Sequence, residues 1–279
     1  MTNIIAAFVT RKLKLSTSIG LISFLLTLGL TAGWQRTQAS TSQQLVQATT
    51  AQNEPTELKN LLTQIDAASS KGNVKGVLQF YDPNFTNGDG LNRQTLEQSL
   101  VSFWQRYPKL RYITKLLSSK SEGNAIIAET QTEITGLPAG NSNNLALNAT
   151  IKSRQRVVAG KIVRQDILSE RTQITSGNKP PQIDIKLPQQ VKVGQKYNFD
   201  AIVQEPLGDD FLLGTALEEP IQPAKFLNPT PVDLELLTSG GLFKVGQAPS
   251  VPGSQWVSAV ILRGNGITMV TQRLQVVNK

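Results

Sequence analysis

The sequence predicts an α+β domain followed by an all-β domain. Apolar residues recur at helical spacing from Leu58 to Tyr107, and strict alternation begins at Leu110. Ten of the 14 prolines lie between Pro180 and Pro252, a density that excludes long helices there. The expected segments are a signal peptide or anchor over 1–39, a flexible tether over 40–53, the α+β domain over 54–176, a linker over 177–181 and a β-sandwich over 182–279.

Composition removes several classes of chemistry. The chain has no cysteine and no histidine, which excludes disulfides, thiol nucleophiles, Ser-His-Asp catalysis and imidazole or thiolate metal sites. We expect no cofactor and no metal. The formal charge is +8, but no run of five basic residues is present and no aromatic residues alternate with basic ones. Nucleic acid is therefore not an expected partner.

The amino-terminal segment has the order of a secretory signal. Basic residues between Arg11 and Lys14 precede an apolar run over 19–34, and small residues follow up to Ala39, where a signal peptidase could cut. The alternative is a retained anchor over 19–34, the only expected contact with a membrane. Both alternatives export the chain to a periplasm, the cell exterior or a thylakoid lumen. Residues 40–53 are too polar to form a core and predict a tether.

Three helices are expected in the first domain. The first begins near Asn53, and the second is capped by Asn73 and stopped by Pro83. The third begins at Asn92 and ends at Pro108. After it the apolar period changes from 3.6 to 2, which predicts antiparallel strands over 110–116, 124–134, 144–158 and 161–174.

The motif Gly-Asn-Val-Lys-Gly-Val-Leu-Gln-Phe-Tyr-Asp-Pro-Asn-Phe over 72–85, followed by Gly88-Asp89-Gly90, resembles the nuclear-transport-factor-2-like superfamily. The resemblance covers about 120 residues and concerns the fold more than the function. It implies a cone-shaped domain in which three helices pack on a curved antiparallel sheet. Members of this superfamily often hold an apolar pocket, whose candidate residues here are Tyr81, Phe85, Trp104, Tyr107 and Tyr112.

Some members of that superfamily are ketosteroid-isomerase-like enzymes, in which a carboxylate takes a proton beside Tyr and acid donors. If this chain were such an enzyme, Asp89 would be the base, with Asp66 and Tyr107 as donors. However, an aspartate between two glycines is ordinary turn chemistry, and the tyrosines occupy positions expected in a core. We therefore expect no catalytic residue.

Cationic residues gather on one face of the predicted sheet. Glu129 and Glu133 share a face of the intervening strand, so cross-strand ion pairs are expected. The alternative is a docking surface for a protein partner or a second copy of the chain. The candidate residues are Lys109, Arg111, Lys115, Lys152, Arg154 and Arg156.

In the second predicted domain, alternating runs over 256–262 and 267–277 flank Asn265-Gly266, a strong hairpin signal. This pattern resembles a bacterial immunoglobulin-like sandwich. Solvated charge, rather than a calcium site, is expected for the acidic residues Glu205, Asp209, Asp210, Glu218 and Glu219.

The sequence thus predicts an exported, non-enzymatic binding or scaffolding protein of the cell envelope that acts through protein contacts of both domains. The alternatives are a carrier of a small apolar ligand in the cone or, less favoured, an isomerase or dehydratase.

Overall fold

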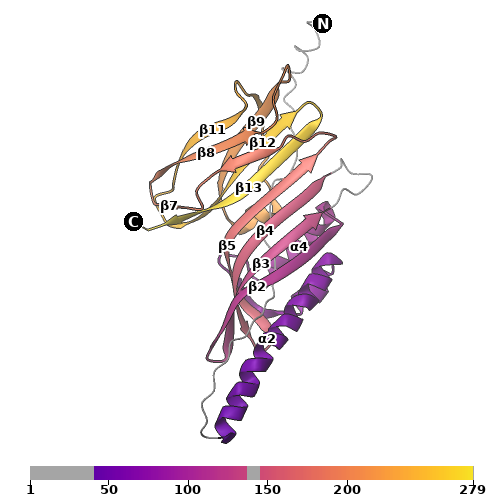
Figure 1. The fold of residues 1–279 in the computed structure, drawn as a ribbon, viewed down its shortest axis with the longest axis vertical. Helices are drawn as coiled ribbons and strands as arrows, with labels where there is room; N and C mark the ends of the chain where they lie inside the picture. The colour runs from indigo at the N-terminus through magenta and orange to yellow at the C-terminus, as the bar shows by residue number, and fades with distance from the viewer. Residues whose placement is uncertain (1–40, 137–144, 279) are drawn as a thin grey trace. The chain divides into compact units, whose positions relative to one another are not determined.

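The computed structural model describes residues 41–136 and 145–278 (Figure 1). The chain is an α+β protein with mostly antiparallel sheets and few helices. It divides into two compact units. The N-terminal unit holds the described residues up to Gly136 and Asn148–Glu170, and the C-terminal unit holds 145–147 and the residues from Arg171 onward.

The longest helix begins earlier than the sequence predicts. Helix α2 spans Thr41–Ser70, so the residues predicted to form a tether over 40–53 are helical from Thr41 onward. Gln and Ala, which are common in this stretch, are good helix formers. A composition too polar for a core therefore does not exclude a helix. No described helix is both long and apolar enough to cross a bilayer, and the predicted signal or anchor lies outside the described residues.

The predicted starts of the next two helices are confirmed. Helix α3 (Val74–Leu78) is capped by the Asn73 side chain, which accepts a hydrogen bond from the Gly76 N–H at 2.9 Å. Helix α4 (Arg93–Arg106) begins with a reciprocal capping box between Asn92 and Thr95. The expected end of the second helix is wrong, because α3 stops at Leu78.

Strand β1 (Tyr81–Asn87) follows that end, so Tyr81 lies on a strand. The Phe80 carbonyl accepts the N–H of Ile162, and Tyr81 is the parallel partner of Ile162 on β5. Pairing with β5 therefore replaces the last helical turn that the apolar spacing predicted.

The sheet of the N-terminal unit has the order β2-β3-β4-β5, with β1 added parallel to β5. Helix α2 lies along β2, as Figure 1 shows. The division between the units falls within β5, after Glu170, because the last residues of β5 pair with β13 in the C-terminal unit. The strands are β2 (Leu110–Glu122), β3 (Ala125–Gly136), β4 (Ala146–Val158) and β5 (Lys161–Ser176).

The C-terminal unit contains two sheets around one core. One sheet has the order β10-β9-β12-β13, with the last residues of β5 antiparallel to β13 and β7 parallel to β13, and the other has the order β11-β8-β6. The core takes Phe199 from β8, Ala259 from β12 and Leu274 from β13. The predicted hairpin is confirmed, since Arg263 pairs with Gly266 at the turn. The elements are β6 (Ile183–Lys186), β7 (Gln190–Lys192), β8 (Lys196–Val203), β9 (Leu212–Pro220), α5 (Pro223–Leu227), β10 (Glu235–Leu236), β11 (Gly241–Gln247), β12 (Gly253–Arg263) and β13 (Gly266–Val277).

Candidate functional site

The five aromatic residues predicted to line a pocket are all buried in the N-terminal unit. Their exposed fractions are 8% or less. The Tyr81 and Phe85 rings meet edge to face with centroids 4.8 Å apart, and the Trp104 and Tyr112 rings do so at 6.4 Å. The fifth, Tyr107, caps the C-terminus of α4. These contacts are those of core residues.

Asp66 is a half-buried carboxylate with an unusual environment. It lies on α2 and accepts two hydrogen bonds from Thr114 on β2, from the backbone N–H at 2.9 Å and from the hydroxyl. Burial raises the pKa of Asp66 from 3.8 to about 6, although both Thr114 hydrogen bonds lower it. Asp66 is therefore able to exchange a proton near neutral pH.

Tyr112 belongs to the same region of the core. Its hydroxyl accepts a hydrogen bond from Trp104 Nε1 at 2.9 Å, and its backbone N–H donates to Ser70 Oγ at 2.9 Å. Burial raises the pKa of Tyr112 strongly, and the charge of Asp66 raises it further. The structure thus brings Asp66 close enough to Tyr112 for an electrostatic interaction.

Asp89 lies in the turn between β1 and α4, on a different element from Asp66. Its backbone N–H donates to Asn87 Oδ1 at 2.6 Å, and the Gly88 N–H donates to the Gln165 carbonyl at 2.9 Å. These bonds form the local turn that the flanking glycines predict.

A buried polar cluster on β3, β4 and β5 was not predicted. The hydroxyl groups of Thr130 and Ser153 lie 2.7 Å apart, and Gln155 Nε2 and Gln165 Nε2 donate to Ser153 Oγ at 3.4 and 3.5 Å. Within the described residues, the side-chain oxygens of both glutamines have no hydrogen-bond partner. Alternation along β4 could have indicated this cluster. Ser153 and Gln155 alternate in step with Ile151 and Val157, so all four side chains lie on the same buried face of the strand.

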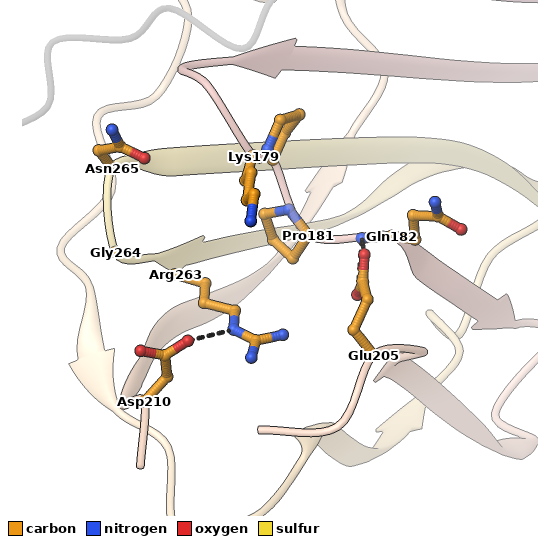
Figure 2. A pocket seen from close by; sticks show the side chains of 9 residues that line it. Lys179, Pro181, Gln182, Glu205, Asp210, Arg263, Gly264 and Asn265 are labelled. Atoms are coloured by element: carbon orange, nitrogen blue, oxygen red, sulfur yellow. Dashed lines mark hydrogen bonds and ion pairs between the residues drawn. The ribbon is translucent and has the colours of Figure 1, made fainter. Parts of the chain in front are cut away.

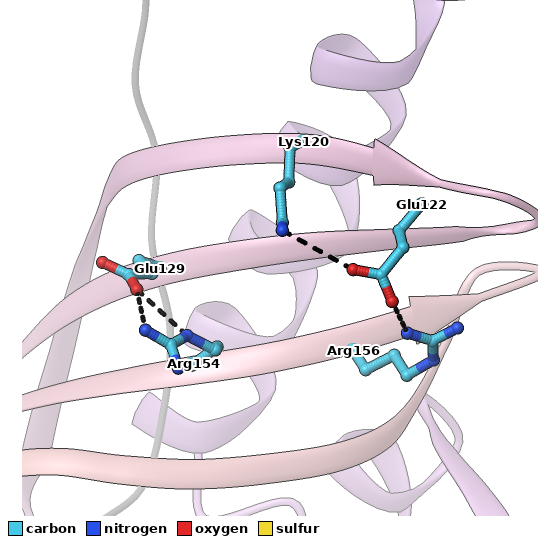
Figure 3. A network of polar contacts seen from close by, with 5 residues as sticks. All are labelled: Lys120, Glu122, Glu129, Arg154 and Arg156. Carbon is cyan, nitrogen blue, oxygen red and sulfur yellow. Dashed lines mark hydrogen bonds and ion pairs between the residues drawn. The ribbon is translucent and has the colours of Figure 1, made fainter.

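The opposite face of this sheet, formed by the exposed side chains of β2, β3 and β4, is called the outer face here. Cross-strand ion pairs cover it, as predicted (Figure 3). Arg154 Nη2 lies 2.5 Å from Glu129, and Arg156 Nη1 lies 2.7 Å from Glu122. The Lys115 ammonium lies 2.9 Å from Glu133. Each such exposed pair contributes about 0–1 kcal/mol to the free energy of unfolding. The pairs therefore order side chains more than they stabilise the fold.

The other three predicted cations of the outer face have a different environment. Lys109, Arg111 and Lys152 are exposed, and none makes an ion pair with another described residue. Ile113, next to Arg111 on the same face, is also exposed. The outer face therefore presents unpaired positive charge beside paired side chains.

In the C-terminal unit, three of the five acidic residues have separate partners. Glu218 accepts a hydrogen bond from Tyr197 and pairs with Lys244, whereas Glu219 pairs with Lys225. Asp210 pairs with Arg263. No group of three metal-ligating side chains is present among the described residues. The expected solvated charge is wrong for Glu219, because this residue is buried beside Lys225.

A cleft of about 580 Å³ lies in the C-terminal unit (Figure 2). Its walls are residues 179–182, the loop that carries Glu205 and Asp210, and the hairpin turn over 263–265. This cleft was not predicted, because its three segments are far apart in the chain.

Comparisons with known proteins cover parts of the chain. A family model described as a domain of unknown function (DUF8623) matches residues 178–277, which include β6 to β13. No curated protein matches the sequence.

Solved structures are similar over less than half of this chain. A variant of Rv3472, a function unknown protein from Mycobacterium tuberculosis, is 13% identical over 43% of this chain and 73% of that chain, with a TM-score of 0.36. Bdellovibrio bacteriovorus Bd1075 is 13% identical over 43% of this chain and only 41% of that chain, with a TM-score of 0.33. A putative polyketide cyclase from Bacillus cereus ATCC 10987 is 20% identical over 42% of this chain and 76% of that chain, with a TM-score of 0.31. These values assign no function.

Proposed function

We propose that this chain is an exported binding or scaffolding protein of the cell envelope, and that it acts through protein contacts. In this proposal, the N-terminal unit is a cone-shaped nuclear-transport-factor-2-like domain and the C-terminal unit is an immunoglobulin-like sandwich. The order of helices before a curved sheet supports the first assignment, and two sheets around one core support the second. The signal-like order of residues 1–39 supports export.

The observation that carries this proposal is the difference among the cations of the outer face. Arg154 and Lys115 are held by glutamates of β3, whereas Arg111 and Lys152 stay exposed without an ion pair among the described residues. A partner with acidic groups can pair with these two cations without breaking an existing bond. Electrostatic complementarity of this kind raises the rate of association and favours the correct partner over others.

Charge reversal at the unpaired positions tests the proposal. Arg111→Glu combined with Lys152→Glu reverses the charge of two of the three cations without an ion pair and does not alter the residues that pair with Lys115 and Arg154. Complex formation is measured by native mass spectrometry of protein purified from its own envelope fraction. The double variant should lose the partner, whereas the matched control Lys186→Glu, an exposed position on β6, should keep it. An unchanged complex in the double variant would refute the proposed surface.

A small-ligand or acid–base site around Asp66 is the second candidate, favoured by the raised pKa of that half-buried carboxyl group. Such a site requires a molecule bound inside the N-terminal unit. Mass spectrometry after gentle purification and denaturation should then detect that molecule in the wild type and in Asp89→Asn, but not in Asp66→Asn. An empty wild-type protein would reject this candidate.

A further inference from the structure

The cleft of the C-terminal unit has one wall of fixed backbone. Gly177 has a φ of +88°, and a Cβ atom there would collide with the Asn265 carbonyl oxygen. A Cβ atom on Gly266 would likewise collide with the Lys179 carbonyl oxygen. Thr268 Oγ1 donates a hydrogen bond to the Pro181 carbonyl at 2.6 Å. Residues 177–181 are therefore held against the β12–β13 hairpin before any ligand arrives.

The opposite wall carries Glu205, whose carboxylate is fixed by a backbone group. The Gln182 N–H donates to its two oxygens at 3.0 and 3.1 Å. The Gln204 N–H in turn donates to the Gln182 carbonyl at 2.9 Å. Within the described residues Glu205 makes no ion pair, so these bonds orient its negative charge but leave it unneutralised.

Arg263 forms the floor between the two walls. Its Nε donates to Asp210 at 2.9 Å, and its Nη2 donates to the carbonyls of Pro206 and Leu207 at 2.7 and 3.2 Å. Only 17% of the side chain is exposed. Asp210 neutralises the charge, and Nη1 makes no hydrogen bond to the described residues. Arg263 is thus a fixed donor.

Lys179 supplies an opposite charge to that of Glu205. Its side chain is exposed, lines the cleft (Figure 2), and makes no ion pair with a described residue. The cleft therefore contains one ammonium and one carboxylate that are not paired with each other. A ligand with a single charge would match only one of them.

We propose that this cleft binds a small zwitterion, a molecule of amino-acid or dipeptide size that carries one ammonium and one carboxylate. The ligand carboxylate takes hydrogen bonds from Lys179 and Arg263 Nη1, and the ligand ammonium donates to Glu205. A cleft of about 580 Å³ accommodates a molecule of this size. This site is independent of the outer face proposed above.

Isothermal titration of the full chain at low salt, with probes of graded length, tests the proposal. The probes are glycine, β-alanine, 4-aminobutyrate, 6-aminohexanoate and glycylglycine. Each has an N-acetyl or amide derivative that keeps only one charge. At least one zwitterion should bind about tenfold or more tighter than both of its derivatives, as expected for hydrogen bonds to charged groups. The length of the best probe distinguishes a free amino acid from a dipeptide.

Three variants connect that binding to the cleft. Glu205→Gln keeps an oxygen for the Gln182 N–H, and it should remove the preference for the free ammonium. Lys179→Met should weaken the zwitterion about tenfold, whereas Lys186→Met on β6 should have no effect. The proposal is overturned if no probe binds at about 10 mM, if the derivatives bind as tightly as the zwitterion, or if Glu205→Gln and Lys179→Met match the wild type.

Discussion

The carboxylate of Asp66 on α2 accepts hydrogen bonds from both the backbone N–H and the hydroxyl group of Thr114 on β2. This pair links the long helix to the sheet of the N-terminal unit. It also holds a titratable group in a half-buried position between helix and sheet, which gives the stability of that unit a distinct dependence on pH.

Stability should fall as the pH rises through the titration of Asp66. The folded-state pKa of Asp66 is raised from 3.8 to about 6, so the folded protein binds this proton more tightly than the unfolded chain does. The contribution is fully present below pH 3.8 and is lost as the pH rises through about 6. Urea unfolding should show the wild type losing about 2 kcal/mol more than Asp66→Asn between these limits. Parallel pH profiles for the two proteins would contradict this prediction.

Tyr112→Phe should destabilise the N-terminal unit by about 1–3 kcal/mol, because it leaves the buried Trp104 N–H without an acceptor. Chemical denaturation followed by circular dichroism measures the loss. The control is Tyr107→Phe, which removes a hydroxyl group that makes no hydrogen bond to described residues. Equal losses in the two variants would show that the bond between Trp104 and Tyr112 is not the cause.

Gly177→Ala should destabilise the C-terminal unit more than Gly194→Ala does. Both glycines have positive φ angles, +88° and +70°. A Cβ atom at Gly194 meets nothing within 4 Å, so only the left-handed conformation costs energy there, about 1–2 kcal/mol. At Gly177 the collision with Asn265 should add about 1–3 kcal/mol. Equal melting temperatures for the two variants would show that residues 177–181 are not held tightly against the hairpin.

Local signals in the sequence were sufficient to predict where several helices and strands begin or turn. Asn73 and Asn92 predict the starts of their helices, because a side-chain cap bonds to the backbone within three residues. Asn265-Gly266 predicts the β12–β13 hairpin, because the turn type depends on these two residues alone. Strand parity likewise gave the cross-strand pair of Arg154 and Glu129.

Features that depend on distant segments were not predictable in the same way. The end of α3 is decided by the pairing of β1 with β5, about 80 residues away in the chain, as the partners Tyr81 and Ile162 show. The hydrogen bonds of Asp66 come from Thr114, 48 residues away in the chain, and the cleft requires Lys179, Glu205 and Arg263 to come from three segments. Propensity and periodicity contain no information about such contacts.

We propose that the outer face binds a protein partner through the exposed cations Arg111 and Lys152. Native mass spectrometry of the wild type and of the Arg111→Glu, Lys152→Glu double variant, each purified from the envelope fraction, tests it most directly. We expect a wild-type complex with a second copy or another protein, and a free monomer for the double variant. A wild-type monomer without a partner, or the same complex in both proteins, would contradict it.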